Sequence, residues 1–173
     1  MKQLQILIIV MVGLLATATV ARADQIRALL TGYEETPAAV STTGGGEFVA
    51  TIDPDGDAIH YTETFSGLQG TVTQSHIHVG QLSITGSIVI FLCQTSTNPD
   101  PTGLAPQCPQ EGTVTGEITA ANVIAGATAT QQLEAGDLAA VITAIRAGAA
   151  YANVHTNLSP GGEIRGQIRT ASK

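Results

Sequence analysis

The sequence predicts an all-β protein, built as an antiparallel Greek-key sandwich or barrel with one short helix. Short runs rich in Val, Ile and Thr alternate apolar and polar residues, which is the period of a half-buried strand. Turn residues separate these runs, and the chain holds 19 Gly and 7 Pro in its 173 residues. A single segment has the helical period instead, so a helical bundle is excluded.

The N-terminus has the three parts of a secretory signal peptide. Lys2 precedes an almost wholly apolar stretch over residues 4–15, and a small-x-small cleavage pattern ends at Ala23. A membrane anchor is the alternative, but the stretch is at the short edge of the about 20 residues that span a bilayer. We therefore expect a signal peptide over 1–23 and a single domain over 24–173.

The charge of the chain limits its partners. Cleavage after Ala23 removes Lys2 and Arg22 and leaves five basic residues against 14 acidic ones, a net charge of −9. Such a surface repels phosphate groups, so neither nucleic acid nor an anionic membrane is expected as a partner. No membrane span is expected after signal cleavage, and the sequence does not specify the oligomeric state.

Eight strands are predicted between turn signals. Two pairs form clear hairpins, around the turns at 53–57 and 157–162. The run 88–92 is apolar on both faces, which predicts a strand buried on both sides or one under a covering loop. The predicted strands are 25–31, 47–52, 58–65, 75–79, 87–92, 112–119, 149–155 and 163–169.

The one predicted helix is about ten residues long and is expected to lie across one end of the sheets. Asp137 is its expected N-cap and Gly148 its C-terminal stop. Its apolar stripe consists of Leu138, Val141, Ile142 and Ile145.

The two cysteines, Cys93 and Cys108, are expected to form a disulfide. An even count in an exported chain favours pairing, which would close the turn-rich segment 94–107. A loop of that size is stabilised by about 3 kcal/mol. The alternative is a reactive or metal-binding thiol pair.

Three histidines are the candidate metal ligands. His76 and His78 lie two residues apart in a predicted strand, so both project from one face. His155 has the same alternation, and if Ile77 and Val154 point into the core, all three histidines point to the outside of the barrel. Neutral imidazole suits copper, zinc or nickel. The alternative is that these rings are simply solvated or bonded to backbone carbonyls.

Acidic residues near the histidines are weaker candidates. Glu163 lies across the last turn from His155 and is a possible carboxylate ligand, and Glu34 and Glu35 are further acidic candidates. The alternative for Glu163 is a cross-strand polar ladder shared with Arg165. His60 is expected to be exposed and is not a candidate ligand.

Other chemistries lack their usual parts. The glycine run at 44–46 is not followed by a helix or a lysine, and no Gly-x-Ser-x-Gly elbow is present. The chain has no Trp and six other aromatic residues, which argues against an aromatic sugar-binding platform. A carboxylate pair that converges only in the fold would make the protein a hydrolase, and the sequence leaves that alternative open.

Four segments resemble the CHRD domain, the module named for chordin. They are residues 30–37 (LTGYEETP), 75–80 (SHIHVG), 147–156 (AGAAYANVHT) and 160–168 (PGGEIRGQI). The resemblance covers nearly all of residues 25–169 and implies an all-β sandwich or barrel, superoxide-dismutase-like or immunoglobulin-like.

The His-x-His strand also resembles the copper-ligand strand of copper-zinc superoxide dismutases. This chain has no clear aspartate and histidine zinc loop and no obvious arginine gate, which argues against dismutase activity. The resulting expectation is a secreted or periplasmic CHRD-domain module, non-catalytic, that binds an unknown protein or cell-surface partner. The alternative is a copper-binding or other transition-metal protein, with redox activity open to it, that uses His76, His78 and His155.

Overall fold

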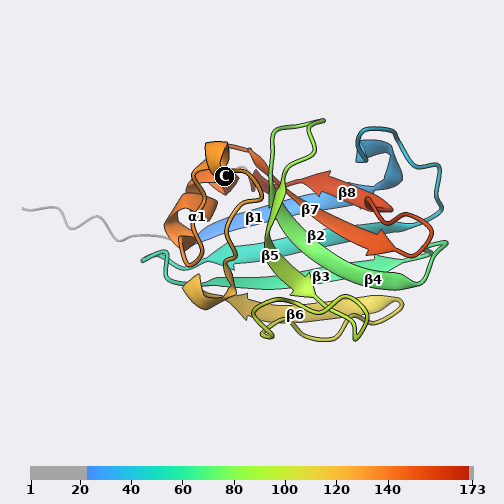
Figure 1. Ribbon diagram of the computed structural model, residues 1–173, viewed down its shortest axis with the longest axis horizontal. Coiled ribbons are helices and arrows are strands. Elements are labelled where there is room, and N and C mark those ends of the chain that lie inside the picture. The colour runs from blue at the N-terminus through green and yellow to red at the C-terminus, as the bar shows by residue number, and fades with distance from the viewer. Residues whose placement is uncertain (1–22, 172–173) are drawn as a thin grey trace, which may run out of the picture.

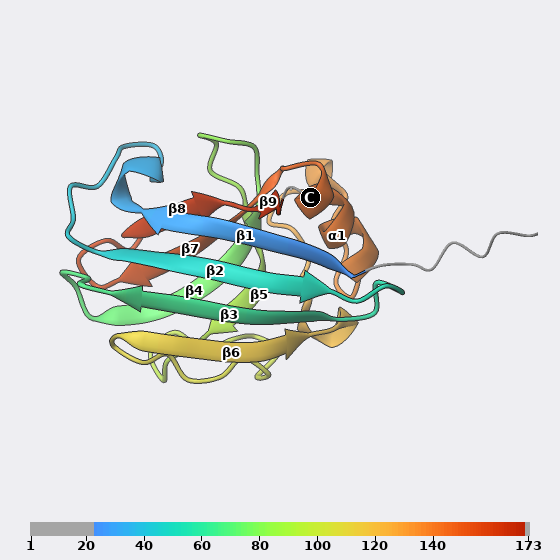
Figure 2. The same ribbon diagram turned by 180° about the vertical axis from the view of Figure 1, so that it is seen from behind.

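A computed structural model describes residues 23–171, so the predicted signal peptide over 1–23 lies almost wholly outside the described residues. The strands form a flattened, nearly closed antiparallel barrel, with β4, β5 and β7 toward the viewer in Figure 1 and β1, β2, β3 and β6 in Figure 2. The predicted all-β class is confirmed. The strands are β1 (Asp24–Thr31), β2 (Gly45–Ile52), β3 (Ile59–Ser66), β4 (Val72–Val79), β5 (Ser87–Cys93), β6 (Gly112–Ile118), β7 (Ala150–Thr156), β8 (Ile164–Gln167) and β9 (Arg169–Thr170).

The strand order has a Greek-key crossing. Hydrogen-bonded neighbours run β5-β4-β7-β8-β1-β2-β3-β6, and β9 pairs with β1. The end strands β5 and β6 contact one another, which nearly closes the barrel. β3 lies beside β6 and β4 lies beside β7, so the chain crosses the barrel between β3 and β4. This crossing brings β4 and β7, which are far apart in the sequence, into register.

Alternating side chains fill the barrel interior, as the sequence predicted. In β1 the buried residues are Ile26, Ala28 and Leu30, and the intervening Arg27 and Leu29 are exposed. The run in β5 is buried on both faces, again as predicted. Backbone of a long loop bonds along this strand, since the Ile124 amide donates to the carbonyl of Val89 at 2.9 Å.

Both predicted hairpins form. In the β2–β3 turn the amide of Asp53 donates to the carbonyl of Ala58, and Gly56 has a φ of +78°, a conformation that favours glycine. The β7–β8 hairpin pairs Asn153 with Arg165 and Val154 with Ile164.

The last predicted strand, 163–169, is two strands in the structure. β8 pairs mainly with β7, and β9 pairs with β1, where Arg169 lies opposite Arg27. At the break, the Ile168 amide still donates to the carbonyl of Ala150. The chain changes its pairing partner there, and sequence periodicity carries no information about partners.

The predicted helix is α1 (Leu138–Arg146), and it lies at the end of the barrel where β1 begins (Figure 2). The carboxylate of Asp137 accepts a hydrogen bond from the Ala140 amide, as an N-cap does. Gly148 follows the helix with a φ of +70°. The four residues of the predicted stripe are buried: Leu138, Val141, Ile142 and Ile145. Three single turns of 3₁₀ helix complete the elements: η1 (Gly32–Glu34), η2 (Ala120–Asn122) and η3 (Ala129–Gln131).

Candidate metal centre

The structure brings together the side chains of His76 and His78 from β4 and His155 from β7, which we call the three-histidine centre. The two strands are direct neighbours, with His76 opposite Asn153 and His78 opposite Tyr151. One ring nitrogen from each histidine can be chosen so that all three lie within 4.8 Å of one another. The ring centroids are 4.8 to 5.8 Å apart.

The histidines are on the predicted face of their strands, but they are not on the surface. Ile77 and Val154 point into the barrel core, so the three rings project from the opposite face. That face is nevertheless covered, because the exposed fractions of His76, His78 and His155 are 0%, 5% and 4%. The rings thus lie on the outer face of the barrel, as expected, but they are covered there, so the alternative of solvated rings is wrong. The β4–β5 loop and the β7–β8 turn supply part of this cover through Gly86 and Pro160, whose carbonyls contact the rings.

Two of the rings are oriented by backbone carbonyls. Nδ1 of His78 lies 3.1 Å from the carbonyl oxygen of Gly86, and Nδ1 of His155 lies 3.0 Å from that of Pro160. A carbonyl only accepts, so each Nδ1 carries the proton and each Nε2 keeps a free lone pair. Both Nε2 atoms and both ring nitrogens of His76 are buried without a hydrogen-bond partner.

Burial lowers the pKa of all three imidazoles. The pKa of His78 falls to about 3, with desolvation as the largest cause and the guanidinium of Arg165 as a smaller one. The pKa of His76 lies well below its ordinary value because of burial and its two histidine neighbours. Burial also lowers the pKa of His155. The rings are therefore neutral at neutral pH, the state that binds a metal ion.

Aromatic rings and one arginine form the walls of the centre. The ring of Phe91 meets His76 edge-on at 4.3 Å, and Tyr151 stacks on His78 at 4.6 Å with an interplanar angle of 9°. Arg165 places its Cζ 3.5 Å from the centroid of the Tyr151 ring. Sequence reasoning did not assign Tyr151 a role, although it shares a strand face with His155.

Arg165 is buried and does not form the polar ladder considered for it. Its guanidinium donates to the hydroxyl of Thr36 at 2.7 Å and to the carbonyls of Gln81 and Ile84 at 3.3 and 3.1 Å. It therefore ties the β4–β5 loop to β8 beside the three-histidine centre. Glu163, the other candidate for that ladder, has different partners.

Glu163 does not join the histidines. Its carboxylate accepts hydrogen bonds from the hydroxyls of Thr42 and Thr156 and from the amides of Gln69 and Gly70, at 2.6 to 3.2 Å. With four donors already bonded, it serves as a structural tie between loops. The weak prediction of Glu163 as a ligand arose from its place in the hairpin, which does not fix the direction of the side chain.

Glu35 is linked to the strand that holds His155 through Asn153. It is buried, and its Oε1 accepts a hydrogen bond from Nδ2 of Asn153 at 2.7 Å. Burial raises its pKa to about 7, against the opposing effects of the Asn153 bond and the Arg165 charge. Glu34 is exposed and accepts from the amide of Gln167. His60 is exposed, as predicted, and lies near Asp53 and Glu117.

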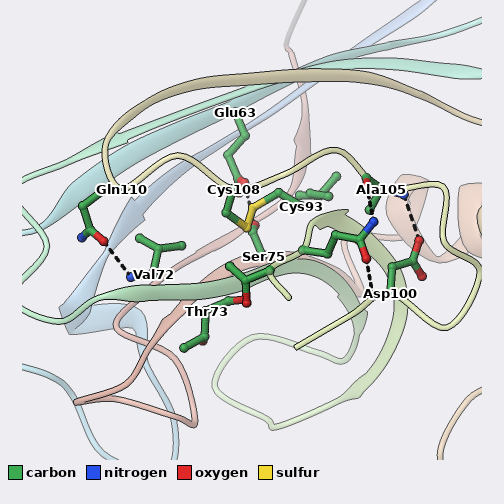
Figure 3. The surroundings of a disulfide bond; sticks show 12 residues. Glu63, Val72, Thr73, Ser75, Cys93, Asp100, Ala105, Cys108 and Gln110 are labelled. Atoms are coloured by element: carbon green, nitrogen blue, oxygen red, sulfur yellow. Dashed lines mark hydrogen bonds between the residues drawn. A yellow bond between two sulfur atoms is a disulfide. The ribbon is translucent and has the colours of Figure 1, made fainter. Parts of the chain in front are cut away.

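The Cys93–Cys108 disulfide forms, as predicted, at the end of β5 (Figure 3). Beside it, in the barrel interior, lies Glu63, which is fully buried. Its Oε2 accepts from the hydroxyl of Ser75 at 2.6 Å, and its Oε1 has no partner. Burial raises the pKa of this carboxyl to about 8. Ser75 and Glu63 lie on the core side of β4, away from the histidines.

The fold and the site define an all-β module with three buried histidines gathered on one face of the sheet. Comparison with known proteins gives its family. A family model for the CHRD domain matches residues 26–168, so the chain belongs to the CHRD domain family. No curated protein and no solved structure matched the chain. Within residues 23–171, no helix is long and apolar enough to cross a membrane.

Proposed function

We propose that this CHRD-domain protein works outside the cytoplasm and binds a transition-metal ion, copper, through His76, His78 and His155. The main support is that buried, neutral imidazole nitrogens from two adjacent strands converge and have no hydrogen-bond partners. Leaving a buried polar atom unpaired costs about 1–3 kcal/mol. A metal ion bound at these lone pairs would offset that cost.

The surroundings of the rings support a ligand role. Metal-binding histidines usually donate their second ring N–H to a carbonyl or carboxylate, which fixes the ring and its tautomer. His78 and His155 both have this arrangement, through the carbonyls of Gly86 and Pro160. An ion bonded at about 2 Å needs nitrogens about 3.4 Å apart. The three nitrogens lie within 4.8 Å of one another, so a bound ion would draw them closer together.

Copper is favoured over other metals by the donor set. The centre offers imidazole nitrogen and no thiolate or carboxylate among residues 23–171. Imidazole suits copper, zinc, iron and nickel, and the resemblance of the His-x-His strand to the copper-ligand strand of copper-zinc superoxide dismutases favours copper among them. Hard oxygen-seeking ions such as magnesium and calcium lack their ligands here.

Titration of the exported protein with copper and zinc tests the proposal. After treatment with a chelator, it is expected to bind one copper ion per chain. His76→Ala and His155→Ala should each lower copper affinity at least tenfold. Removing only the hydrogen-bond partner of a metal-binding histidine lowers affinity by about tenfold or more, and removing the ligand itself should lower it no less. His155→Gln repeats the test with less loss of volume, and His60→Ala is the matched control because His60 is exposed. Unchanged affinity in all of the ligand variants, each shown to be folded, would refute the proposal.

Export is supported by the start of the fold and by the disulfide. β1 begins at Asp24, directly after the expected cleavage site at Ala23, and Cys93 is bonded to Cys108. N-terminal sequencing of the exported chain is expected to begin at Asp24. An N-terminus that retains residues 1–23 would argue for the anchor alternative.

A further inference from the structure

Among residues 23–171, two charged side chains contact residues that adjoin the three-histidine centre. Arg165 of β8 lies over the ring of Tyr151, and that same ring stacks on His78. Glu35, which follows η1, bonds to Asn153, the residue of β7 opposite His76. When Glu35 is ionised, its charge is balanced by that of Arg165, so the pair leaves no surplus negative charge for a bound ion.

The ligands add no negative charge either. Among the described residues 23–171, three imidazoles make up the group, with no carboxylate or thiolate atom in it. Glu163, the next acidic residue along the chain from His155, already accepts four hydrogen bonds elsewhere. An ion in the centre would therefore keep its whole charge in a buried position.

Burial acts differently on the two common states of copper. The cost of transferring an ion from water rises with the square of its charge, so a divalent ion pays about four times what a monovalent ion pays. Repulsion by Arg165 is twice as large for the divalent ion. Divalent copper also favours square-planar or tetragonal coordination by nitrogen and oxygen. Here the ring centroid of Phe91 lies 4.3 Å from that of His76, so an apolar wall stands on that side.

We propose that the three-histidine centre holds copper in its monovalent state in preference to its divalent state. This inference rests on the proposed function, and it adds the oxidation state for which the site is built. Arg165 and Glu35 are positioning charges with opposite effects: Arg165 favours the monovalent ion, and Glu35 opposes it.

Two competition titrations of the exported protein measure the preference. One uses cuprous ion with a cuprous-specific chelator under nitrogen, and the other uses cupric ion with a cupric chelator, both at pH 8. That pH lies above the pKa of about 7 for Glu35. Cuprous ion is expected to bind at least 100-fold more tightly, which places the reduction potential of the bound copper about 120 mV above that of the free ions.

Two variants that each remove a charge should change the ratio of cuprous to cupric affinity in opposite directions. Arg165→Met should lower the ratio of cuprous to cupric affinity roughly tenfold. The two copper ions differ by one unit of charge, and this is the effect of one positive charge within about 10 Å of them at an effective dielectric constant of about 20. Glu35→Gln keeps the oxygen that accepts from Asn153 and should raise the ratio. Arg27→Met is the matched control, because Arg27 is exposed on β1, and it should leave the ratio unchanged.

The outcomes separate this inference from the proposed function. If neither copper state binds, the proposed function fails. If both states bind with similar affinity, the function stands and the preference is refuted. Should Arg165→Met fail to fold, Glu35→Gln decides alone, and a lowered or unchanged ratio in that variant overturns the inference.

Discussion

Replacing Glu63 by glutamine should remove the loss of stability that this carboxyl causes as the pH rises from 6.5 to 8. Glu63 is fully buried in the barrel, with Ser75 as the hydrogen-bond partner of one carboxyl oxygen and none for the other. Glutamine has nearly the same shape, keeps an oxygen that accepts from Ser75, and cannot ionise. The substitution therefore removes a proton-binding group while it disturbs little of the packing.

The magnitude follows from the pKa of this carboxyl, which burial raises from 4.5 to about 8. The unfolded chain loses the proton at a lower pH than the folded chain. Stability is therefore complete below pH 4.5, falls as the pH rises toward 8, and levels off above it. Each pH unit in that window costs about 1.4 kcal/mol, so the whole window costs on the order of 5 kcal/mol.

Urea unfolding at half-unit steps from pH 6.5 to 8 measures this loss. Near pH 6.5 the three buried histidines are neutral in the folded protein but about half protonated in the unfolded chain, so their titration raises stability with pH. This contribution is the same in the wild type and in Glu63→Gln, so it cancels when the two slopes are compared. The free energy of unfolding of the wild type should fall by about 1 kcal/mol per pH unit or more relative to Glu63→Gln. The difference in slope is the test, because the amide group of glutamine shifts the absolute stability at every pH alike.

Glu47→Gln is the matched control, because Glu47 is an exposed carboxylate on β2, and its pH profile should follow that of the wild type. Parallel profiles for the wild type and Glu63→Gln would mean that Glu63 is ionised in the folded protein. The account of the barrel interior as a site that holds a neutral carboxylic acid would then be wrong.

Further substitutions at three sites test the contacts that hold the fold. Joint replacement of Cys93 and Cys108 by serine should lower the free energy of unfolding by about 3 kcal/mol, and a loss under 1 kcal/mol would contradict the loop-closure estimate. Asp137→Ala should cost about 1 kcal/mol because it removes the N-cap of α1, whereas Asp137→Asn should cost little; both are measured by urea unfolding. Tyr61→Phe removes the buried hydrogen bond to the carbonyl of Leu92, so a fall in thermal stability equivalent to about 1–2 kcal/mol is expected, and no change would mean that this bond contributes nothing.

Alternation in the sequence predicted which face each strand presents. It placed His76, His78 and His155 on one side and Ile77 and Val154 on the other, because the side-chain period of a strand is two. Alternation also puts Glu63 on the face of Tyr61 and Phe65, a signal that would have identified it as an inward carboxyl and that was not used.

The burial of the histidines was not predictable in the same way. Their cover depends on where the carbonyls of Gly86 and Pro160 lie, and these belong to loops whose conformation has no periodic signal. Arg165 was misjudged for the same reason, since its partners Thr36, Gln81 and Ile84 all come from loops. The direction of a side chain is thus encoded locally, whereas what lies on top of it is decided by the tertiary fold.

The pairing of β4 with β7 has a consequence for when the centre can exist. These strands are consecutive neighbours in the sheet but are separated in the chain by β5, β6 and α1. Before this pairing forms, only the two imidazoles of β4 are held close together by their own strand. Under the proposed function, full affinity requires this pairing. Metal binding would then report that β4 and β7 have paired and would stabilise the finished barrel.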